Sequence, residues 1–285
     1  MARKLTHTIA GALLLAGAVY AFGPAGARPP RAEGKAAVPP LDAGAASPIE
    51  LEGTRIKARR ADDALASLDD LVGAVLVGRI DGGIRNAFRI DGVEVDPADP
   101  SGETVLYALS VQDRATGAWR GACAPDARGV ARGFPLAGAW TEAGEHVRSP
   151  GRFELTCTSG ALGKCVRMGY KPWQGDAMWD RHQACVRMVR ADYCGDGVGH
   201  TRNGTTIDVY DTVGIQAADP GAALAFEAAW GKDGAVCVRR TRLPDVTTLE
   251  EIVSTCPARL AAQSGAACSD AAARRDPRAL LFNKS

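Results

Sequence analysis

Three side chains between residues 192 and 200 have the types needed for acid–base chemistry. Asp192, Asp196 and His200 surround a glycine-rich turn, so two carboxylates and one imidazole lie in one short stretch. Such a set can transfer protons or hold a cation. Turn formation explains the same residue types, because Asp side chains bond to backbone amides in turns. We expect the structural role, and the alternative is an extracytoplasmic hydrolase or metal-dependent enzyme that uses these three residues.

The same stretch also contains a candidate set of zinc ligands. His182, Cys185, Cys194 and His200 have the ligand types of a tetrahedral zinc site. Their spacing lacks the tight Cys-x2-Cys pair of such sites, and cysteines of exported proteins are usually oxidised. We therefore predict disulfides here, with no bound metal and no other cofactor.

Two further motifs in this region have simpler explanations as turns. Gly195-x-Gly197-x-Gly199 follows a predicted helix, whereas dinucleotide sites require a strand, a loop and then a helix. Asn203-Gly204-Thr205 is a glycosylation sequon, but a tight turn accounts for the same residues. The sequence shows no Ser-His-Asp elbow, Walker loop or His-Glu-x-x-His motif. It therefore favours a non-enzymatic binding or structural module.

A helix and a hairpin must position these residues. Met178, Cys185 and Val189 recur at helical spacing, which predicts a helix over residues 177–190, and Gly195 ends it. The Asn203-Gly204 dipeptide then lies between two β-prone runs, 198–202 and 205–210, and such a dipeptide predicts a hairpin.

The predicted helix end carries a sequence signature. The run from Ala191 to Gly197, ADYCGDG, resembles the signature of the ADYC domain. Supporting words occur at Lys164–Val166, Tyr170–Trp173, His182–Cys185 and Asp208–Ile215, so the resemblance covers about residues 149–245. It implies a bacterial domain of exported proteins with no established activity. We expect the signature to be a folding device, in which Tyr193 is buried with its hydroxyl bonded and a Cys194 disulfide fixes the helix end to another segment.

The rest of the chain has mainly β character. Residues 49–148 alternate like an antiparallel meander, with a buried strand within 71–80. A short helix at 161–170 capped by Ser159 follows, and a second hairpin joins 224–230 to 235–242. Residues 246–285 are expected to add a helix capped by Thr247 or Thr248, a disulfide-closed tail and a last strand at 280–282 to the same globule. The predicted fold class is α+β: mainly antiparallel β with two or three short helices, stapled by disulfides.

The N-terminus has the features of a signal peptide. Arg3 and Lys4 precede an apolar run that is short for a membrane span, and Ala25-Gly26-Ala27 fits a cleavage site. Residues 1–27 are therefore interpreted as a signal peptide, and 28–48 as a disordered linker rich in Pro, Ala and Gly. The membrane is a partner only if the segment stays uncleaved as an anchor. The expected location is extracytoplasmic: periplasmic, on the cell surface or secreted.

Composition supports this location and limits the partners. The formal net charge is only +1, which argues against binding to nucleic acid through bulk electrostatics. The expected partner is therefore an unknown envelope or extracellular molecule. An exported chain with eight cysteines is expected to form four disulfides, although sequence does not choose the pairing. The disulfide cysteines are predicted to be Cys123, Cys157, Cys165, Cys185, Cys194, Cys237, Cys256 and Cys268.

Overall fold

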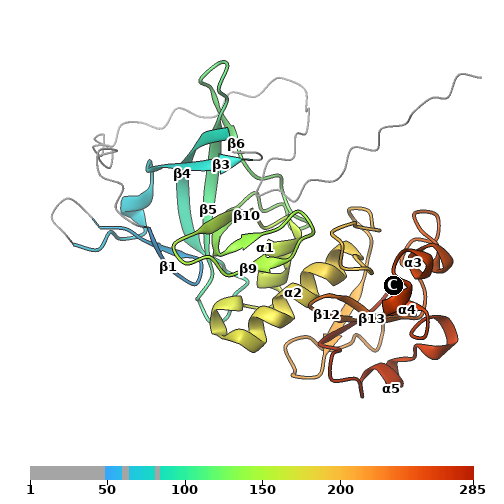
Figure 1. Ribbon diagram of the computed structural model, residues 1–285. Coiled ribbons are helices and arrows are strands. Elements are labelled where there is room, and N and C mark those ends of the chain that lie inside the picture. The colour runs from blue at the N-terminus through green and yellow to red at the C-terminus, as the bar shows by residue number, and fades with distance from the viewer. Residues whose placement is uncertain (1–48, 60–63, 81–83) are drawn as a thin grey trace, which may run out of the picture.

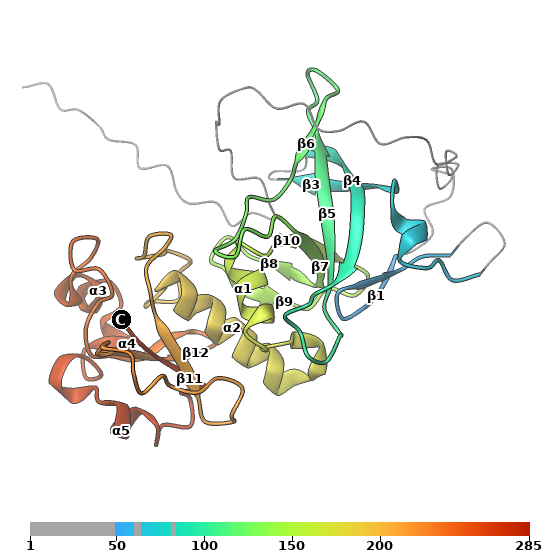
Figure 2. The same cartoon turned by 180° about the vertical axis from the view of Figure 1, so that it is seen from behind.

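The computed structural model describes residues 49–59, 64–80 and 84–285. The predicted signal peptide and linker lie outside these residues. The described chain forms two antiparallel sheets with two helices between them (Figures 1 and 2). The helices are α1 (Ala161–Arg167) and α2 (Asp176–Arg190), so the predicted helix over 177–190 is confirmed.

The first sheet comes from the N-terminal half of the described chain. Its strand order is β10-β7-β5-β4-β3, and β6 also pairs with β5. Nearly every side chain of β5 is buried, so this strand is the centre of the sheet. The strands are β3 (Val75–Ile80), β4 (Ile84–Val95), β5 (Val105–Gln112), β6 (Trp119–Gly121), β7 (Gly133–Ala137) and β10 (Phe153–Cys157).

Two small hairpins flank this sheet. The strands β1 (Glu50–Glu52) and β2 (Arg55–Lys57) pair with each other, and the Ile56 amide donates to the Tyr107 hydroxyl over 2.9 Å. The second hairpin pairs β8 (Ala139–Trp140) with β9 (His146–Val147). A short 3-10 turn, η1 (Asp69–Leu71), precedes β3.

The expected buried strand within 71–80 is only half right. The strand β3 forms, but it lies at the edge of the sheet, where Val75 is 49% exposed and Val77 is 62% exposed. An uninterrupted apolar run does not reveal whether a strand is central or at an edge, because that depends on which strands pair with it.

The second sheet comes from the C-terminal part of the chain. Its order is β11-β14-β12-β13, and the predicted hairpin of 224–230 with 235–242 is confirmed as β12–β13. The predicted last strand is β14, which lies in the interior of the sheet between β11 and β12. The strands are β11 (Asp208–Asp211), β12 (Phe226–Gly231), β13 (Gly234–Val238) and β14 (Leu281–Lys284).

Short helices follow this sheet's main hairpin. The first, α3 (Leu249–Thr255), begins with a capping box: Thr248 accepts from the Glu251 amide, and the Glu251 side chain accepts from the Thr248 amide. The predicted Thr248 cap is therefore confirmed. The remaining short elements are η2 (Pro172–Gln174), α4 (Pro257–Leu260), η3 (Gly265–Ala267) and α5 (Asp270–Ala273).

Two local predictions are wrong. Asn203-Gly204 forms a turn, with Gly204 at φ +88°, but it does not join a hairpin: 198–202 is not a strand, and β11 pairs with β14. The segment lies instead against the end of α2, where the His200 amide donates to the Arg190 carbonyl. The predicted Ser159 cap is also absent, because Gly160 is the N-cap of α1 and makes no side-chain hydrogen bond.

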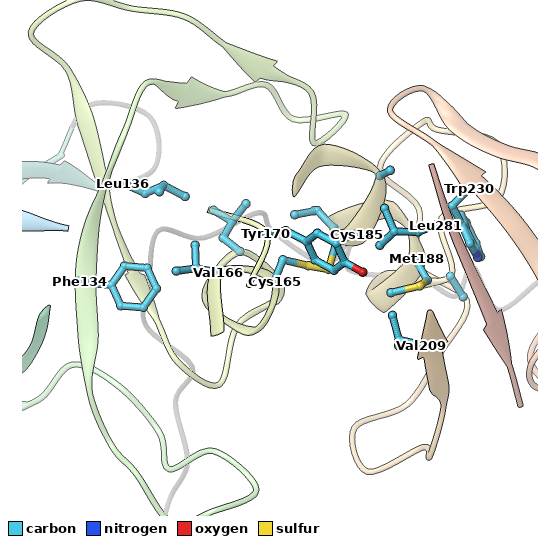
Figure 3. Close-up of a cluster of buried hydrophobic side chains, with 14 of the residues drawn as sticks. Phe134, Leu136, Cys165, Val166, Tyr170, Cys185, Met188, Val209, Trp230 and Leu281 are labelled. Carbon is cyan, nitrogen blue, oxygen red and sulfur yellow. A yellow bond between two sulfur atoms is a disulfide. The ribbon is translucent and has the colours of Figure 1, made fainter. Parts of the chain in front are cut away.

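One hydrophobic core joins both sheets to the helices. In Figure 3 it runs from Phe134 on β7 through the Cys165–Cys185 disulfide to Met188 on α2 and Trp230 on β12. Ile252 of α3 and Leu260 of α4 belong to the same cluster, so the C-terminal helices pack on the same core. The α+β, mainly antiparallel, disulfide-stapled fold class is confirmed.

Four disulfides use all eight cysteines. Three of them join cysteines 20 to 34 positions apart in the sequence, and the fourth, Cys194–Cys256, joins cysteines 62 positions apart. No cysteine is left as a thiol. Within the described ranges, no helix has the length and apolar character needed to cross a membrane. The pairs are Cys123–Cys157, Cys165–Cys185, Cys194–Cys256 and Cys237–Cys268.

Candidate functional site

The predicted site lies where α2 ends. Ala191 adopts the left-handed conformation, with φ 51°, and is the one residue other than glycine with positive φ in the described part of the chain. This turn lets the Asp192 amide donate to the Arg187 carbonyl over 2.9 Å, which satisfies an unpaired group of the last turn. The Ala191 methyl is completely buried, so a larger side chain has no room there.

Asp192 holds the turn that follows. Its side chain is completely buried and accepts the backbone N–H groups of Gly195, Asp196 and Gly197 at 2.9, 3.1 and 3.0 Å. It also pairs with Arg187 at 2.6 Å. Burial raises the pKa of the Asp192 carboxyl, and Arg187 opposes that shift. The carboxylate therefore supports the backbone of the turn.

Arg187 links this turn to both halves of the molecule. Besides Asp192, its guanidinium donates to the carbonyl of Ala143, in the turn between β8 and β9, and to that of Lys232, in the turn between β12 and β13. Both partners of the ion pair are almost fully buried. One buried arginine thus fixes three loops that are far apart in the sequence.

Tyr193 is the aromatic anchor of the signature. Its ring is completely buried and stacks on Trp230, with 5.2 Å between ring centroids. Its hydroxyl donates to Glu227 over 3.0 Å and accepts the Arg242 amide over 2.8 Å. Burial and the nearby Glu227 carboxylate raise the pKa of Tyr193, so the hydroxyl stays protonated. The predicted burial and hydrogen bonding of Tyr193 are confirmed.

Behind Tyr193 lies a buried ion pair that the sequence interpretation missed. Arg242 donates to both oxygens of Glu227, at 3.0 and 3.1 Å, and also to the carbonyls of Met188 and Val189 at the end of α2. Asn283 completes the network by donating to Glu227 over 2.7 Å. The one available signal was an acid inside the apolar run FEAAW at 226–230.

A disulfide fixes the turn from its other side. Cys194 is bonded to Cys256, the single residue between α3 and α4, which caps both helices. The next residue, Gly195, has φ +75°, and a Cβ there would lie 1.9 Å from the Asp233 carbonyl oxygen. The turn therefore packs backbone against backbone on the β12–β13 turn, and only glycine fits at this position.

The three candidate catalytic residues do not converge. Asp192 points at backbone amides, whereas Asp196 is exposed and accepts the Val198 amide of its own turn over 2.9 Å. His200 is half-buried, and its ring lies 5.9 Å from that of Tyr193. No described carboxylate accepts a hydrogen bond from the His200 ring. Burial lowers the pKa of His200, and the negative charges of Asp196 and Asp192 oppose that shift.

The candidate zinc ligands are also separated. Cys185 and Cys194 belong to different disulfides. His182 is completely buried on α2, and its Nε2 lies 3.2 Å from the Leu162 carbonyl oxygen. Over the ranges that the structure describes, no group of three or more His, Cys, Asp or Glu side chains has the arrangement of a metal site.

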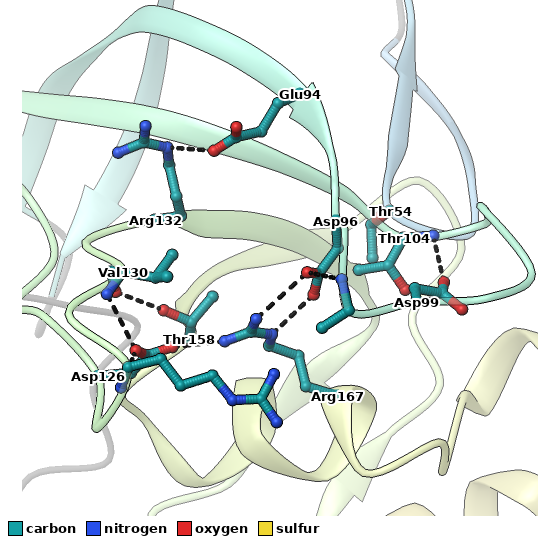
Figure 4. Close-up of polar contacts among 12 residues, drawn as sticks. Thr54, Glu94, Asp96, Asp99, Thr104, Asp126, Val130, Arg132, Thr158 and Arg167 are labelled. Carbon is teal, nitrogen blue, oxygen red and sulfur yellow. Dashed lines mark hydrogen bonds and ion pairs between the residues drawn. The ribbon is translucent and has the colours of Figure 1, made fainter.

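A second set of buried charges joins α1 to the first sheet (Figure 4). Arg167 pairs with Asp96 at 2.7 Å and with Asp126, and all three side chains are mostly buried. Lys171 pairs with Asp99 at 2.8 Å close by. These pairs were not predicted, because nothing in the local sequence distinguishes a buried arginine from an exposed one.

Comparison with known proteins gives one match. The family model of the ADYC domain matches residues 68–244. The matched region includes every strand of the first sheet and so begins well before the 149–245 stretch that carries the signature words. No curated protein matches the chain, and neither does any solved structure.

Proposed function

The chain belongs to the ADYC domain family, and from this premise we propose that it is an exported, disulfide-stabilised module of the cell envelope that binds a partner or supports structure without catalysis. Four disulfides support export, because disulfides persist mainly in oxidising compartments outside the cytoplasm. The signal-peptide features of residues 1–27 support the same location. The proposed partner is an envelope or extracellular molecule and not a nucleic acid.

One observation carries the non-enzymatic part of the proposal. Asp192, Tyr193 and Cys194, the three reactive residue types of the signature, all direct their polar or sulfur atoms at internal partners. A catalytic group needs an accessible position near a substrate atom. The signature therefore fits a role in folding, and the hydrolase or metal-enzyme alternative at Asp192, Asp196 and His200 has no supporting geometry.

Export can be tested on the whole chain. The protein with its native N-terminus is produced in a bacterium and recovered from the cytoplasmic, periplasmic, membrane and medium fractions. We expect a chain that begins at Arg28 and lies outside the cytoplasm. An Ala27→Asp variant should remain uncleaved, because cleavage requires a small residue there. N-terminal sequencing decides the result, and a start at Met1 or Ala2 would identify an anchor and place the protein at the membrane.

Partner binding needs a separate experiment. The mature, oxidised protein is immobilised and exposed to envelope fractions and to culture medium, and bound molecules are eluted and identified. Bovine serum albumin at the same density is the control surface. Saturable retention of one envelope component supports the binding module. The enzyme alternative would be established instead if the protein turned over a substrate and the His200→Ala variant lost that turnover while keeping the wild-type melting temperature.

A further inference from the structure

Asn203-Gly204 lies at the tip of an exposed turn that belongs to neither sheet. Arg202, Asn203 and Gly204 are all exposed, and the next strand, β11, begins only at Asp208. Two hydrogen bonds close the turn: the Thr205 amide and the Thr205 hydroxyl both donate to the Arg202 carbonyl, over 3.2 and 2.9 Å. Local movement of this tip therefore breaks few contacts.

Two groups at this tip are free to react with each other. The Gly204 amide donates to no acceptor among the residues that the structure describes, and the Asn203 side chain makes no hydrogen bond to any of them. Gly204 has no side chain, and a Cβ added there would meet nothing within 4 Å. Nothing therefore blocks the approach of the Gly204 nitrogen to the amide carbon of the Asn203 side chain.

We propose that Asn203 is a site of spontaneous deamidation, in which the chain modifies itself and water is the co-reactant. The Gly204 nitrogen loses its proton to a base in the solvent and attacks the Asn203 Cγ, which forms a five-membered succinimide ring. The bond from Cγ to the side-chain nitrogen breaks, and ammonia leaves with a proton from the solvent. Water then opens the ring at either carbonyl, which gives aspartate or isoaspartate at position 203 without any oxidant or reductant.

The other two asparagines of the chain lack this combination of features. Asn86 lies within β4, where it is paired with β3, and Ala87 follows it. Asn283 is completely buried in β14, donates to Glu227 and is followed by Lys284. A side chain on the following residue hinders attack by its nitrogen, and a paired strand cannot rotate to close the ring. Both asparagines should therefore stay intact.

Asp196-Gly197 shows how the fold protects a related sequence. An aspartate before glycine can close the same ring, yet the Gly197 amide donates to the buried Asp192 carboxylate over 3.0 Å. A Cβ at Gly197 would lie 2.8 Å from the Glu142 carbonyl oxygen, so the backbone is packed tightly there. An accessible backbone nitrogen, and not the following glycine alone, distinguishes Asn203.

Deamidation adds a negative charge beside an exposed ion pair. Arg202 pairs with Asp245 at 2.7 Å, and both side chains are largely exposed. A carboxylate at position 203 competes with Asp245 for the Arg202 guanidinium. Exposed pairs contribute little to stability, so the charge of the protein should change while its melting temperature does not.

The test follows the three asparagines in one sample. The mature, oxidised protein is incubated at neutral and at mildly alkaline pH, digested and mapped by mass spectrometry. We expect a gain of about one dalton at Asn203 alone, with both aspartate and isoaspartate products. The reaction should be faster at the higher pH, because a base removes the Gly204 proton. Protein that is reduced, alkylated and kept unfolded in guanidinium chloride gives the rate set by sequence alone, and the native rate at Asn203 should lie within a few-fold of it.

Matched variants test the mechanism. Gly204→Ala should slow the modification severalfold, because a methyl group hinders attack by the nitrogen of its own residue. Gly129→Ala is the control, since Gly129 is also an exposed turn glycine with positive φ and nothing within 4 Å of an added Cβ, but it follows Arg128. It should leave the rate at Asn203 unchanged. Asn203→Gln should stay unmodified, because its longer side chain would have to close a six-membered ring.

Four results would overturn the proposal. They are an intact Asn203, aspartate without isoaspartate, equal rates in Gly204→Ala and wild type, and a native rate about tenfold or more below that of the unfolded chain. The last result would show that the fold protects the turn. Export and partner binding do not depend on this modification, so their experiments can fail or succeed independently of it.

Discussion

The Asp192 carboxylate and the Arg187 guanidinium lie 2.6 Å apart, and neither side chain is more than 4% exposed. Both groups also bond to backbone: Asp192 accepts three amides of its turn, and Arg187 donates to carbonyls of two distant loops. The pair therefore has few unsatisfied hydrogen-bonding positions, which is the condition under which a buried ion pair is tolerated.

Removing the Asp192 charge should be costly. Asp192→Asn leaves Arg187 uncompensated and turns an NH2 group toward backbone donors, so we expect a loss of roughly 3–5 kcal/mol in the free energy of unfolding. Asp196→Asn, the same change four residues later on an exposed side chain, should cost less than about 0.5 kcal/mol. Urea denaturation of both variants measures the difference. Equal effects would mean that the Asp192 contacts do not hold the turn.

The Cys194–Cys256 disulfide should be a major stabilising link. It closes a loop with a sequence separation of 62, for which restriction of the unfolded chain predicts about 4 kcal/mol. The double variant Cys194→Ala/Cys256→Ala should lose about this amount. Cys194→Ala alone should also form mispaired species, because it frees the Cys256 thiol, and non-reducing electrophoresis should reveal them. A double variant as stable as wild type would show that the disulfide is dispensable.

The Tyr193 hydroxyl should matter more than that of another tyrosine. Tyr193→Phe leaves the Arg242 amide and one Glu227 oxygen without this partner in a fully buried site, so a loss of roughly 1–3 kcal/mol is expected. Tyr210→Phe removes a hydroxyl that donates to Asp270 at a partly buried position, and should cost about 1 kcal/mol or less. Thermal and urea unfolding of the two variants check this order, and a larger effect at Tyr210 would contradict it.

Acid should destabilise the protein through His182. Burial lowers its pKa from 6.5 to about 4, so between these values the unfolded chain binds a proton that the folded protein excludes. Stability is therefore full above about pH 6.5 and falls as pH drops toward about 4, by up to about 3 kcal/mol. His146 contributes in the same direction, because burial lowers its pKa to about 4 as well.

His182→Gln isolates this contribution. The amide can still donate to the Leu162 carbonyl but does not titrate, so the variant's free energy of unfolding should depend less on pH between about 4 and 6.5. Urea unfolding across this range, for wild type and variant, measures the two slopes. Identical slopes would assign the acid sensitivity to other groups.

Sequence alone predicted the elements whose signals are local. The helix over 177–190, the hairpin around Gly234 and the Thr248 capping box each follow from residues a few positions apart, and all three form. The predicted stop at Gly195 is wrong, because Ala191 takes the left-handed conformation that ends the helix four residues earlier. The buried Tyr193 and the bonded Cys194 were also expected, because buried tyrosines usually bond their hydroxyl and the cysteines of a chain predicted to be exported are usually oxidised.

Features that depend on distant partners were not predictable. Asn203-Gly204 has the sequence of a hairpin turn, but the strand after it, β11, pairs with residues 281–284, which lie about 70 positions later in the sequence. Arg242 and Glu227 are 15 positions apart in the sequence, and neither has a local signal of burial. They are buried because the fold brings them together as an ion pair, in which Arg242 also donates to the Met188 carbonyl near the end of α2. The disulfide pairing was unpredictable for the same reason, since the fold and not the spacing of the cysteines decides which of them meet.

The position of β14 has a consequence for the order in which the protein can fold. This strand is the last element in the sequence, yet it lies between β11 and β12, so β11 has no described neighbour in its sheet without it. Residues 281–284 must therefore be in place before the second sheet can assemble. Until then Asn283 is absent from the Glu227 network and Leu281 from the core. The second sheet therefore assembles through β14, which alone connects β11 to the β12–β13 hairpin among the described strands.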